Sequence, residues 1–167
     1  MRVADRIAEW LDEKQIHTAF GIVGGGNIAL FDAIAKANKT QIVCCHHEQA
    51  AAMASCYFNR TQGRLGSVVL VTTGAGSSNA ITGVLAAHMD GIPLLVISGN
   101  EDSKHFDRRN RIKGVQGFPV TEMVAHRACK VAWRITVGES AIGYFDDGYS
   151  EATSPRQGAV WLDLPKD

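Results

Sequence analysis

The sequence lacks an excess of charge of either sign, because its 17 Lys and Arg residues balance its 17 Asp and Glu residues. No basic surplus favours binding to nucleic acid, and no block of like charges marks a tail. A chain without net charge has little electrostatic protection against self-association. We therefore expect an oligomer and no nucleic-acid partner.

Long apolar runs are also absent. No segment reaches membrane-spanning length, and the charged, amphipathic start MRVADRIAEWLDEK lacks the apolar stretch of a signal peptide. Cysteines are few, and no two form a C-x-x-C pair. We expect buried, reduced thiols, no metal site, no membrane partner and a cytoplasmic location. The four cysteines are Cys44, Cys45, Cys56 and Cys129.

What is present is an alternation of helix patterns with short β-branched runs, in a chain that is 46% hydrophobic. Near-continuous apolar strands between helices predict a single α/β domain over residues 1–167. Its sheet is expected to be doubly wound and mostly parallel, with about six strands and helices on both faces. Strands are predicted at residues 17–23, 40–46, 67–73, 93–98, 130–135 and 159–164. Helices are predicted near the N-terminus, after Asn27, at 47–60 and 79–89, and near 120–129 and 140–152.

Ligands bind beyond the carboxyl ends of the strands in such a sheet. The first candidate segment there is Gly24–Gly26. Its spacing does not match G-x-G-x-x-G, and no acidic residue ends the second strand, which argues against a dinucleotide or flavodoxin-like module. The glycines fit either a tight turn, in which Asn27 caps the next helix, or close approach of backbone to a flat ligand.

The second candidate segment is Thr72–Asn79, which joins a buried strand to a helix. Backbone N–H groups and hydroxyls gather at such a junction and favour an anion. Ordinary capping of the helix by Ser77, Ser78 or Asn79 explains the same residues. Both readings stay open from the sequence.

The third candidate is Glu48, at the start of a helix rich in alanine. A glutamate in a first helical turn usually complements the helix dipole. Small residues behind it suit close packing against a second surface, however, and a carboxylate at a dry interface would favour a shared proton. The neighbouring His47 is expected to pack rather than to act.

These segments, in this order, resemble the pyrimidine-binding (PYR) domain of thiamine-diphosphate enzymes of the acetolactate synthase and 2-oxo acid decarboxylase type. The resemblance rests on AFGIVGGGNIALFDAI, CCHHEQAAAMASCYFNRTQG, VVLVTTGAGSSNAITGVLAAHMDGIPLLVISGN and GAVWLDLPKD. It covers essentially the whole chain. Val23 and Ala75 stand where the family usually has proline.

The resemblance implies the roles of individual residues. Glu48 would hydrogen-bond a ring nitrogen of the cofactor's aminopyrimidine and favour its imino tautomer, which takes the proton from the thiazolium carbon. Gln116, in the long polar loop 99–118, would reach the substrate. The same loop carries a basic cluster of Lys104, His105, Arg108, Arg109 and Arg111, expected to be solvated. The cofactor-binding residues would be Gly24, Gly25, Thr73, Gly74, Gly76 and Asn79.

The family's diphosphate and Mg²⁺ site, a Gly-Asp-Gly motif with a later Asn, is not found, and Asp146-Asp147-Gly148 falls in a helix pattern. The resemblance therefore implies a partner, a diphosphate-binding (PP) domain or subunit that holds Mg²⁺, in a homo- or hetero-oligomer acting on a 2-oxo acid. The chain is either a natural small subunit or a piece of a longer enzyme, inactive by itself. The alternative is a non-catalytic binding or regulatory module that retains the fold.

Overall fold

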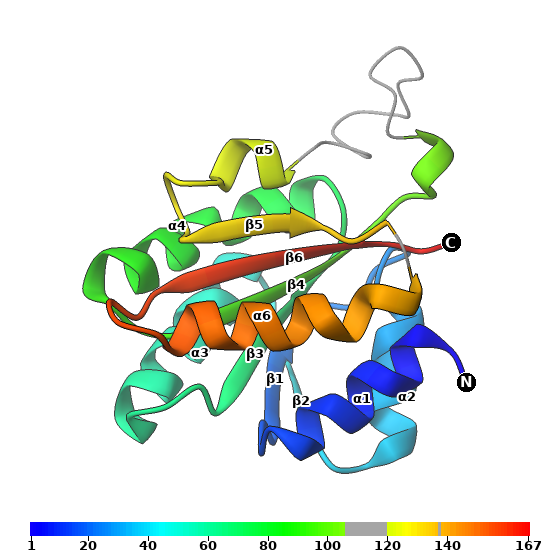
Figure 1. Ribbon diagram of the computed structural model, residues 1–167, viewed down its shortest axis with the longest axis horizontal. Coiled ribbons are helices and arrows are strands. Elements are labelled where there is room, and N and C mark those ends of the chain that lie inside the picture. Colours follow the sequence, from blue (N-terminus) through cyan, green and yellow to red (C-terminus); the bar gives the residue numbers. More distant parts are fainter. Residues whose placement is uncertain (106–119, 137) are drawn as a thin grey trace.

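The computed structural model describes residues 1–105, 120–136 and 138–167. Within them the strands form one all-parallel, six-stranded sheet in the order β2-β1-β3-β4-β6-β5 (Figure 1), so the predicted fold class is confirmed. The strands are β1 Thr18–Gly21, β2 Gln41–Cys44, β3 Ser67–Val71, β4 Leu94–Asn100, β5 Val131–Arg134 and β6 Ala159–Pro165. The helices are α1 Val3–Glu13, α2 Ile28–Ala37, α3 Glu48–Gln62, α4 Ala75–Asp90, α5 Val120–Val124 and α6 Ala141–Thr153, with 3-10 turns at Ser103–His105 and Gly138–Ser140.

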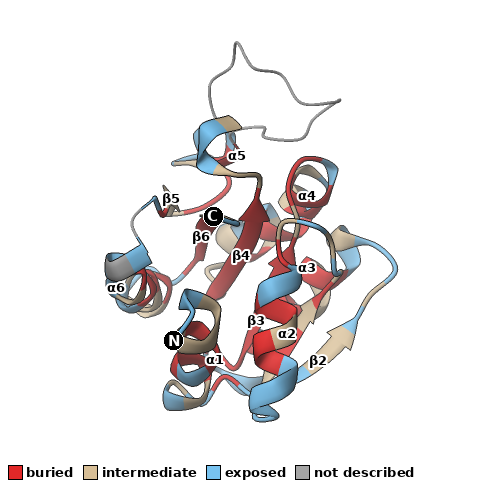
Figure 2. Cartoon of the chain, turned by 90° about the vertical axis from the view of Figure 1, so that its right-hand side faces the viewer, coloured by how far each residue is buried: buried red, intermediate tan, exposed pale blue. Residues whose placement is uncertain are grey.

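Helices cover both faces of the sheet. Alternate residues of β4 point to opposite sides: Leu95 and Ile97 pack with α1, α2 and α6, and Leu94 and Val96 pack with α3, α4 and α5. Figure 2 shows the buried residues concentrated along β3, β4 and β6. Burial on both faces explains why these strands are apolar without alternation.

Two helix boundaries differ from those predicted. The helix α4 begins at Ala75 rather than Asn79, because it starts from Gly74 without a capping side chain. The helix α5 ends at Val124, and shortly beyond it His126 takes a left-handed φ of 59° that stops helical continuation. Neither boundary carries a sequence signal of the usual kind.

The cysteines divide into two groups. Cys56 and Cys129 are buried as predicted, and burial raises the pKa of the Cys129 thiol to about 12. Cys44 is exposed at the end of the edge strand β2, so the prediction of burial is wrong there. Among the described residues, no helix is both long enough and apolar enough to cross a membrane.

Candidate functional site

The candidate site lies where the chain order of the sheet reverses. From β1 the chain moves to β2 on one side, then returns to β3 on the other side of β1. The connections after β1 and β3 therefore leave in opposite directions, which opens a crevice at the carboxyl ends of these strands. The glycine turn follows β1, the Thr72–Gly76 turn follows β3, and Glu48 opens the helix after β2.

The glycine turn is pressed against its neighbours at two of its three positions. A Cβ on Gly24 would lie 2.6 Å from Thr72 Cγ2, and one on Gly26 would lie 2.7 Å from the carbonyl oxygen of Gly99. The amide of Gly26 also donates to Thr72 Oγ1 at 3.2 Å. A Cβ on Gly25 would meet no heavy atom within 4 Å, and this residue is exposed. Packing thus requires Gly24 and Gly26, whereas Gly25 presents bare backbone to open space.

Asn27 closes this turn instead of capping the next helix. It precedes α2 but makes no side-chain cap bond there. Its Oδ1 accepts from the amide of Gly24 at 2.7 Å, and its Nδ2 donates to the carbonyl of Ile22 at 3.0 Å. The side chain is 2% exposed, and the turn's buried polar backbone needs these partners more than the helix end does. The predicted cap is wrong for this reason.

The turn after β3 depends on a glycine rather than on a capping side chain. Gly74 stands before α4 with a φ of 67° and a ψ of −117°, a conformation that L side chains rarely adopt. Ser77 Oγ donates backward to the carbonyl of Thr72 at 2.7 Å, and Ser78 Oγ to that of Ala75 at 3.2 Å. Capping by Ser77, Ser78 or Asn79 is therefore wrong, because all three lie inside the helix.

Glu48 is half-buried and faces this second turn. Its Oε2 accepts a hydrogen bond from Asn79 Nδ2 at 3.1 Å, and its Oε1 lies 3.4 Å from the position of a Cβ on Gly76. The same Cβ would lie 2.8 Å from Thr72 Cγ2. The absence of a side chain at Gly76 thus lets this turn pack closely against Thr72 and the carboxylate; Asn79 holds Oε2, and Oε1 lies over bare backbone.

His47 holds the start of the same helix. Its Nδ1 accepts from the amide of Gln49 at 3.2 Å, which caps α3. The side chain is exposed, so the expectation that it packs is wrong. Capping fixes where the helix begins, and with it the position of Glu48 as the first helical residue.

Thr73 is buried and points into the protein. Its Oγ1 donates to Asn100 Oδ1 at 2.8 Å, and the residue is 9% exposed. Gln116 lies outside the described residues, as do Arg108, Arg109 and Arg111 of the basic cluster. Lys104 of that cluster is exposed and pairs with Asp102 at 3.0 Å.

Sequence reasoning missed Asn100 and Asp163, which lie behind Thr73. Asn100 Nδ2 donates to Asp163 Oδ2 at 2.7 Å, and Asp163 is 0% exposed. Burial raises the pKa of Asp163, partly offset by donors from Ser98, Asn100 and Arg134. A carboxylate inside the apolar strand AVWLDLP is rare, and this signal is present in the sequence.

The crevice suits a flat ring that exchanges a proton. Gly25 presents backbone to open space, Gly76 places no side chain beneath the carboxylate, and Glu48 supplies a half-buried carboxylate. Among residues 1–105, 120–136 and 138–167, no cluster of three or more His, Cys, Asp or Glu side chains could hold a metal ion.

The sequence is similar to a known family and to several known proteins. Residues 1–123 match the family described as thiamine pyrophosphate enzyme, N-terminal TPP binding domain. The acetolactate synthase large subunit of Buchnera aphidicola (Acyrthosiphon pisum symbiont strain) is 32% identical over 166 residues, covering 98% of this chain and 28% of the relative. The acetolactate synthase isozyme 3 large subunit of Escherichia coli K12 shows the same identity, aligned length and two coverages. The mitochondrial acetolactate synthase catalytic subunit of Saccharomyces cerevisiae is 32% identical over 161 residues, 95% of this chain and 22% of its own length.

Proposed function

The chain belongs to the family of N-terminal TPP-binding domains of thiamine pyrophosphate enzymes, and on this premise we propose that it is the pyrimidine-binding half of such an enzyme. The chain spans less than a third of the length of the relatives named above. The activity, substrates and partners of the complete protein are therefore part of the proposal.

The observation that carries the proposal is the surroundings of Glu48. A half-buried carboxylate faces a glycine-lined crevice, and Asn79 already occupies one of its oxygens. Glu48 would hold or share a proton with a ring nitrogen through the other oxygen, Oε1. Gly25 and Gly76 would admit the ring, while Thr73 and Gly74 would shape the wall on which it rests. Thiamine diphosphate, when bound, supplies a nucleophilic carbon that attacks the carbonyl of a 2-oxo acid.

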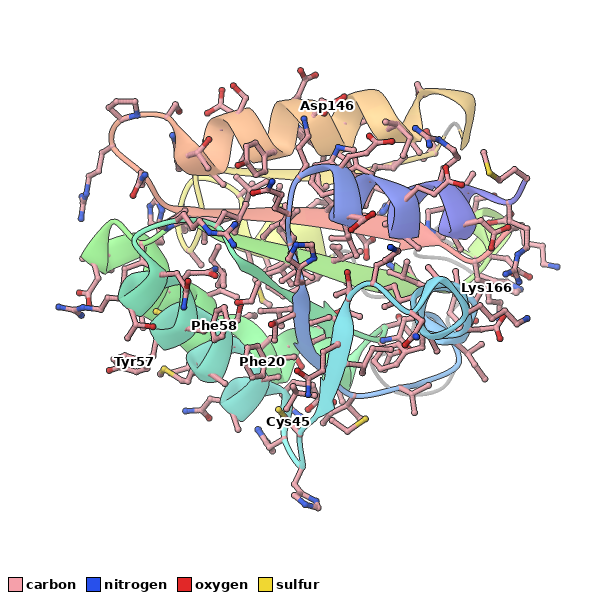
Figure 3. All side chains as sticks on the ribbon, turned by 90° about the horizontal axis from the view of Figure 1, so that it is seen from below. Phe20, Cys45, Tyr57, Phe58, Asp146 and Lys166 are labelled. Atoms are coloured by element: carbon pink, nitrogen blue, oxygen red, sulfur yellow. The ribbon has the colours of Figure 1, made fainter. Side chains whose placement is uncertain are left out.

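The second half of the site would come from a partner that binds α3 and α4. These helices carry only three charged side chains of Asp, Glu, Lys or Arg type: Glu48, Arg60 and Asp90. Three large apolar side chains of these helices are exposed: Tyr57 by 59%, Leu85 by 40% and Met89 by 63%. Figure 3 shows Tyr57 pointing outward, whereas Phe58 and Phe20 meet edge to face with ring centroids 5.9 Å apart. We call the exposed residues Tyr57, Leu85 and Met89 the α3–α4 face.

Exposed apolar surface of this kind marks an interaction site. Glu48 lies at the start of α3 beside the first turns of α4, and the α3–α4 face lies further along the same two helices. A partner bound to this face would therefore cover the crevice from the side. We assign it to the diphosphate-binding domain or subunit, which would carry Mg²⁺. The assembled enzyme would act as a lyase or carboligase on a 2-oxo acid, in the cytoplasm.

The test is Glu48→Gln in the chain assembled with a diphosphate-binding partner. We expect turnover of pyruvate, measured as decarboxylation or carboligation, to fall by about 10²- to 10⁴-fold, because glutamine cannot share the proton. Glu151→Gln changes a half-buried glutamate of α6 and should leave turnover intact. Near-native activity of Glu48→Gln would favour the alternative, a non-catalytic module.

The half-site can be tested separately. Mixed with Mg²⁺, thiamine diphosphate and pyruvate, the chain alone should show negligible turnover and weak cofactor binding. Robust activity without a second polypeptide would contradict the proposal. Tight binding of NAD by calorimetry would instead support a dinucleotide-binding module.

A further inference from the structure

Asp163 is the centre of a buried polar network at the carboxyl end of the sheet. Its Oδ1 accepts from Ser98 Oγ, which itself accepts from Trp161 Nε1 at 2.8 Å. Its Oδ2 accepts from Asn100 Nδ2 at 2.7 Å and from Arg134 Nε at 3.4 Å. The two strands that flank β6, β4 and β5, thus supply the partners of one carboxylate.

The network fixes which way the Asn100 amide faces. Since its Nδ2 is committed to Asp163, its Oδ1 must point to the opposite side. There it accepts two hydrogen bonds, from Thr73 Oγ1 and from the amide of Glu101, both at 2.8 Å. The Thr73 hydroxyl is consequently a donor in this contact, and its side-chain rotamer is fixed.

Asn100 also connects the site to the residues that follow β4. The amide that it holds belongs to Glu101, the residue directly after β4. The end of β6 holds the same segment: Lys166 Nζ binds Glu101 Oε2 at 2.7 Å, and Asp167 accepts from the amide of Ser103 at 2.8 Å. One asparagine therefore ties the β3–α4 turn to the residue that follows β4.

A second buried asparagine shows what a purely structural role looks like. Asn59, 0% exposed, binds the carbonyls of Ser67 and Pro93 and the amides of Gly66 and Ser67. These groups lie at the amino ends of β3 and β4, away from the crevice. Asn59 satisfies strand ends, whereas Asn100 joins a buried charge to a hydroxyl at the candidate site.

We propose that Asp163 and Asn100 are positioning residues that hold Thr73, and through it the turn from Thr72 to Gly76, in the conformation that a bound aminopyrimidine ring requires. The inference rests on the proposed function for its ligand. A buried ion is a costly way to stabilise a fold, and apolar residues of similar volume are often as stable. The carboxylate of Asp163 orients the Asn100 amide, and Asn100 in turn orients Thr73, which precedes the positive-φ Gly74.

The experiment compares Asn100→Ala, Thr73→Val and their double variant with Asn59→Ala as the matched control. In the assembled enzyme, we expect Asn100→Ala and Thr73→Val each to raise the Kd for thiamine diphosphate by about tenfold. At saturating cofactor, kcat should change by less than about twofold. The double variant should be no worse than either single one, because both break the same connection. Asn59→Ala should lower thermal stability without changing the Kd.

A second measurement uses the chain alone. Amide chemical shifts of Thr73, Gly74 and Glu101 should move in Asn100→Ala and remain in place in Asn59→Ala. Asp163→Asn, which keeps side-chain volume, should move the same three amides and serves if Asn100→Ala does not fold. Unmoved amides in these variants would overturn the positioning role.

The two measurements separate the two proposals. A wild-type assembly that does not use thiamine diphosphate would defeat the proposed function, while the amide shifts would still decide the positioning role. Additive effects in the double variant, or an equal rise in Kd for Asn59→Ala, would reduce Asn100 to a structural residue.

Discussion

The two helical layers of this domain pack on the same sheet but differ in their outer surfaces. The helix α1 alone carries five charged residues, Asp5, Arg6, Glu9, Asp12 and Glu13, whereas α3 and α4 together carry three. The layer of α1, α2 and α6 thus has the charged exterior of a solvated surface. The α3–α4 face lacks one and lies beside Glu48.

The layers also differ in how closely their helices approach. A Cβ on Gly83 of α4 would lie 2.5 Å from Ala52 Cβ on α3, so these helices touch through small residues. In the other layer, Gly143 of α6 has no heavy atom within 4 Å of a Cβ position. Close packing of α3 and α4 keeps Glu48 over Gly76 and Asn79, which indicates that one layer is built for the site and the other for solvent.

The largest expected effect breaks this contact. Gly83→Ala should lower the free energy of unfolding by about 1–3 kcal/mol, because the added methyl group overpacks the α3–α4 contact. Gly143→Ala should instead raise it by up to about 1 kcal/mol, because alanine favours a helix and meets no neighbour. Urea unfolding of both variants measures the difference. Equal changes in the two would remove the packing distinction between the layers.

The next effect concerns the partner. Tyr57→Glu, on the α3–α4 face, should weaken association with the diphosphate-binding partner by at least about tenfold, since it places a charge in an apolar interface. Ile28→Glu is the matched control in α2, with 60% exposure against 59%. It should change association by less than about twofold. Calorimetric titration of each chain with the partner would reveal whether both surfaces, or neither, bind it.

The buried carboxylate between the layers should respond to pH. Because burial raises the pKa of Asp163 above its unfolded value, its contribution to stability is complete below that unfolded value and is lost as the pH rises through the folded pKa. Asp163→Asn should therefore reduce the fall in the free energy of unfolding as the pH rises above the usual pKa range of an aspartate. Urea unfolding from pH 4 upward measures this; a wild-type curve that the substitution leaves unchanged would contradict it.

The smallest effects concern exposed ion pairs, and for the pair of Lys14 and Asp146 in the solvated layer the pH dependence has the opposite sign. Lys14 lies 2.7 Å from Asp146, and its hydrogen bond, followed by that of Trp10, holds the pKa of Asp146 below its usual range. This stability is present above the unfolded pKa and is lost as the pH falls through the folded one. Lys14→Met should lower the free energy of unfolding by about 0.5 kcal/mol at neutral pH, measured by urea unfolding. It should also reduce the fall in that free energy as the pH is lowered. Arg60→Met, which breaks a more exposed pair with Asp90, is the comparison and should cost less.

The parallel sheet was predictable because its strands are buried on both faces. SVVLV and LLVIS are continuous apolar runs, and such runs between helical patterns are typical of the central strands of a parallel sheet. Helix starts were harder to predict. Asn27 looks like a cap and serves the glycine turn, and α4 starts at a glycine whose φ cannot be read from the chain.

The candidate site was likewise predictable from the sequence only in part. Glu48 and the glycine turns can each be recognised from a short stretch of sequence. They lie close together because each follows a strand, and the carboxyl ends of parallel strands lie at the same edge of the sheet. The link from Thr73 through Asn100 to Asp163 joins residues 27 and 63 positions apart, and no local pattern specifies that pairing. The roles proposed for Glu48, Gly24, Gly25, Gly76 and Asn79 remain predictions.

The place of β6 in the sheet has a consequence for folding. It inserts between β4 and β5, and its Asp163 meets Ser98 from 65 positions earlier in the chain. Pairings this distant in sequence form late, after local helices and turns. Until β6 docks, Asn100 has no carboxylate to orient it, and the turn at Thr73 stays unfixed. We therefore expect cofactor affinity to reach its full value only at the final folding step, so that a bound cofactor stabilises fully folded molecules over those that are still folding.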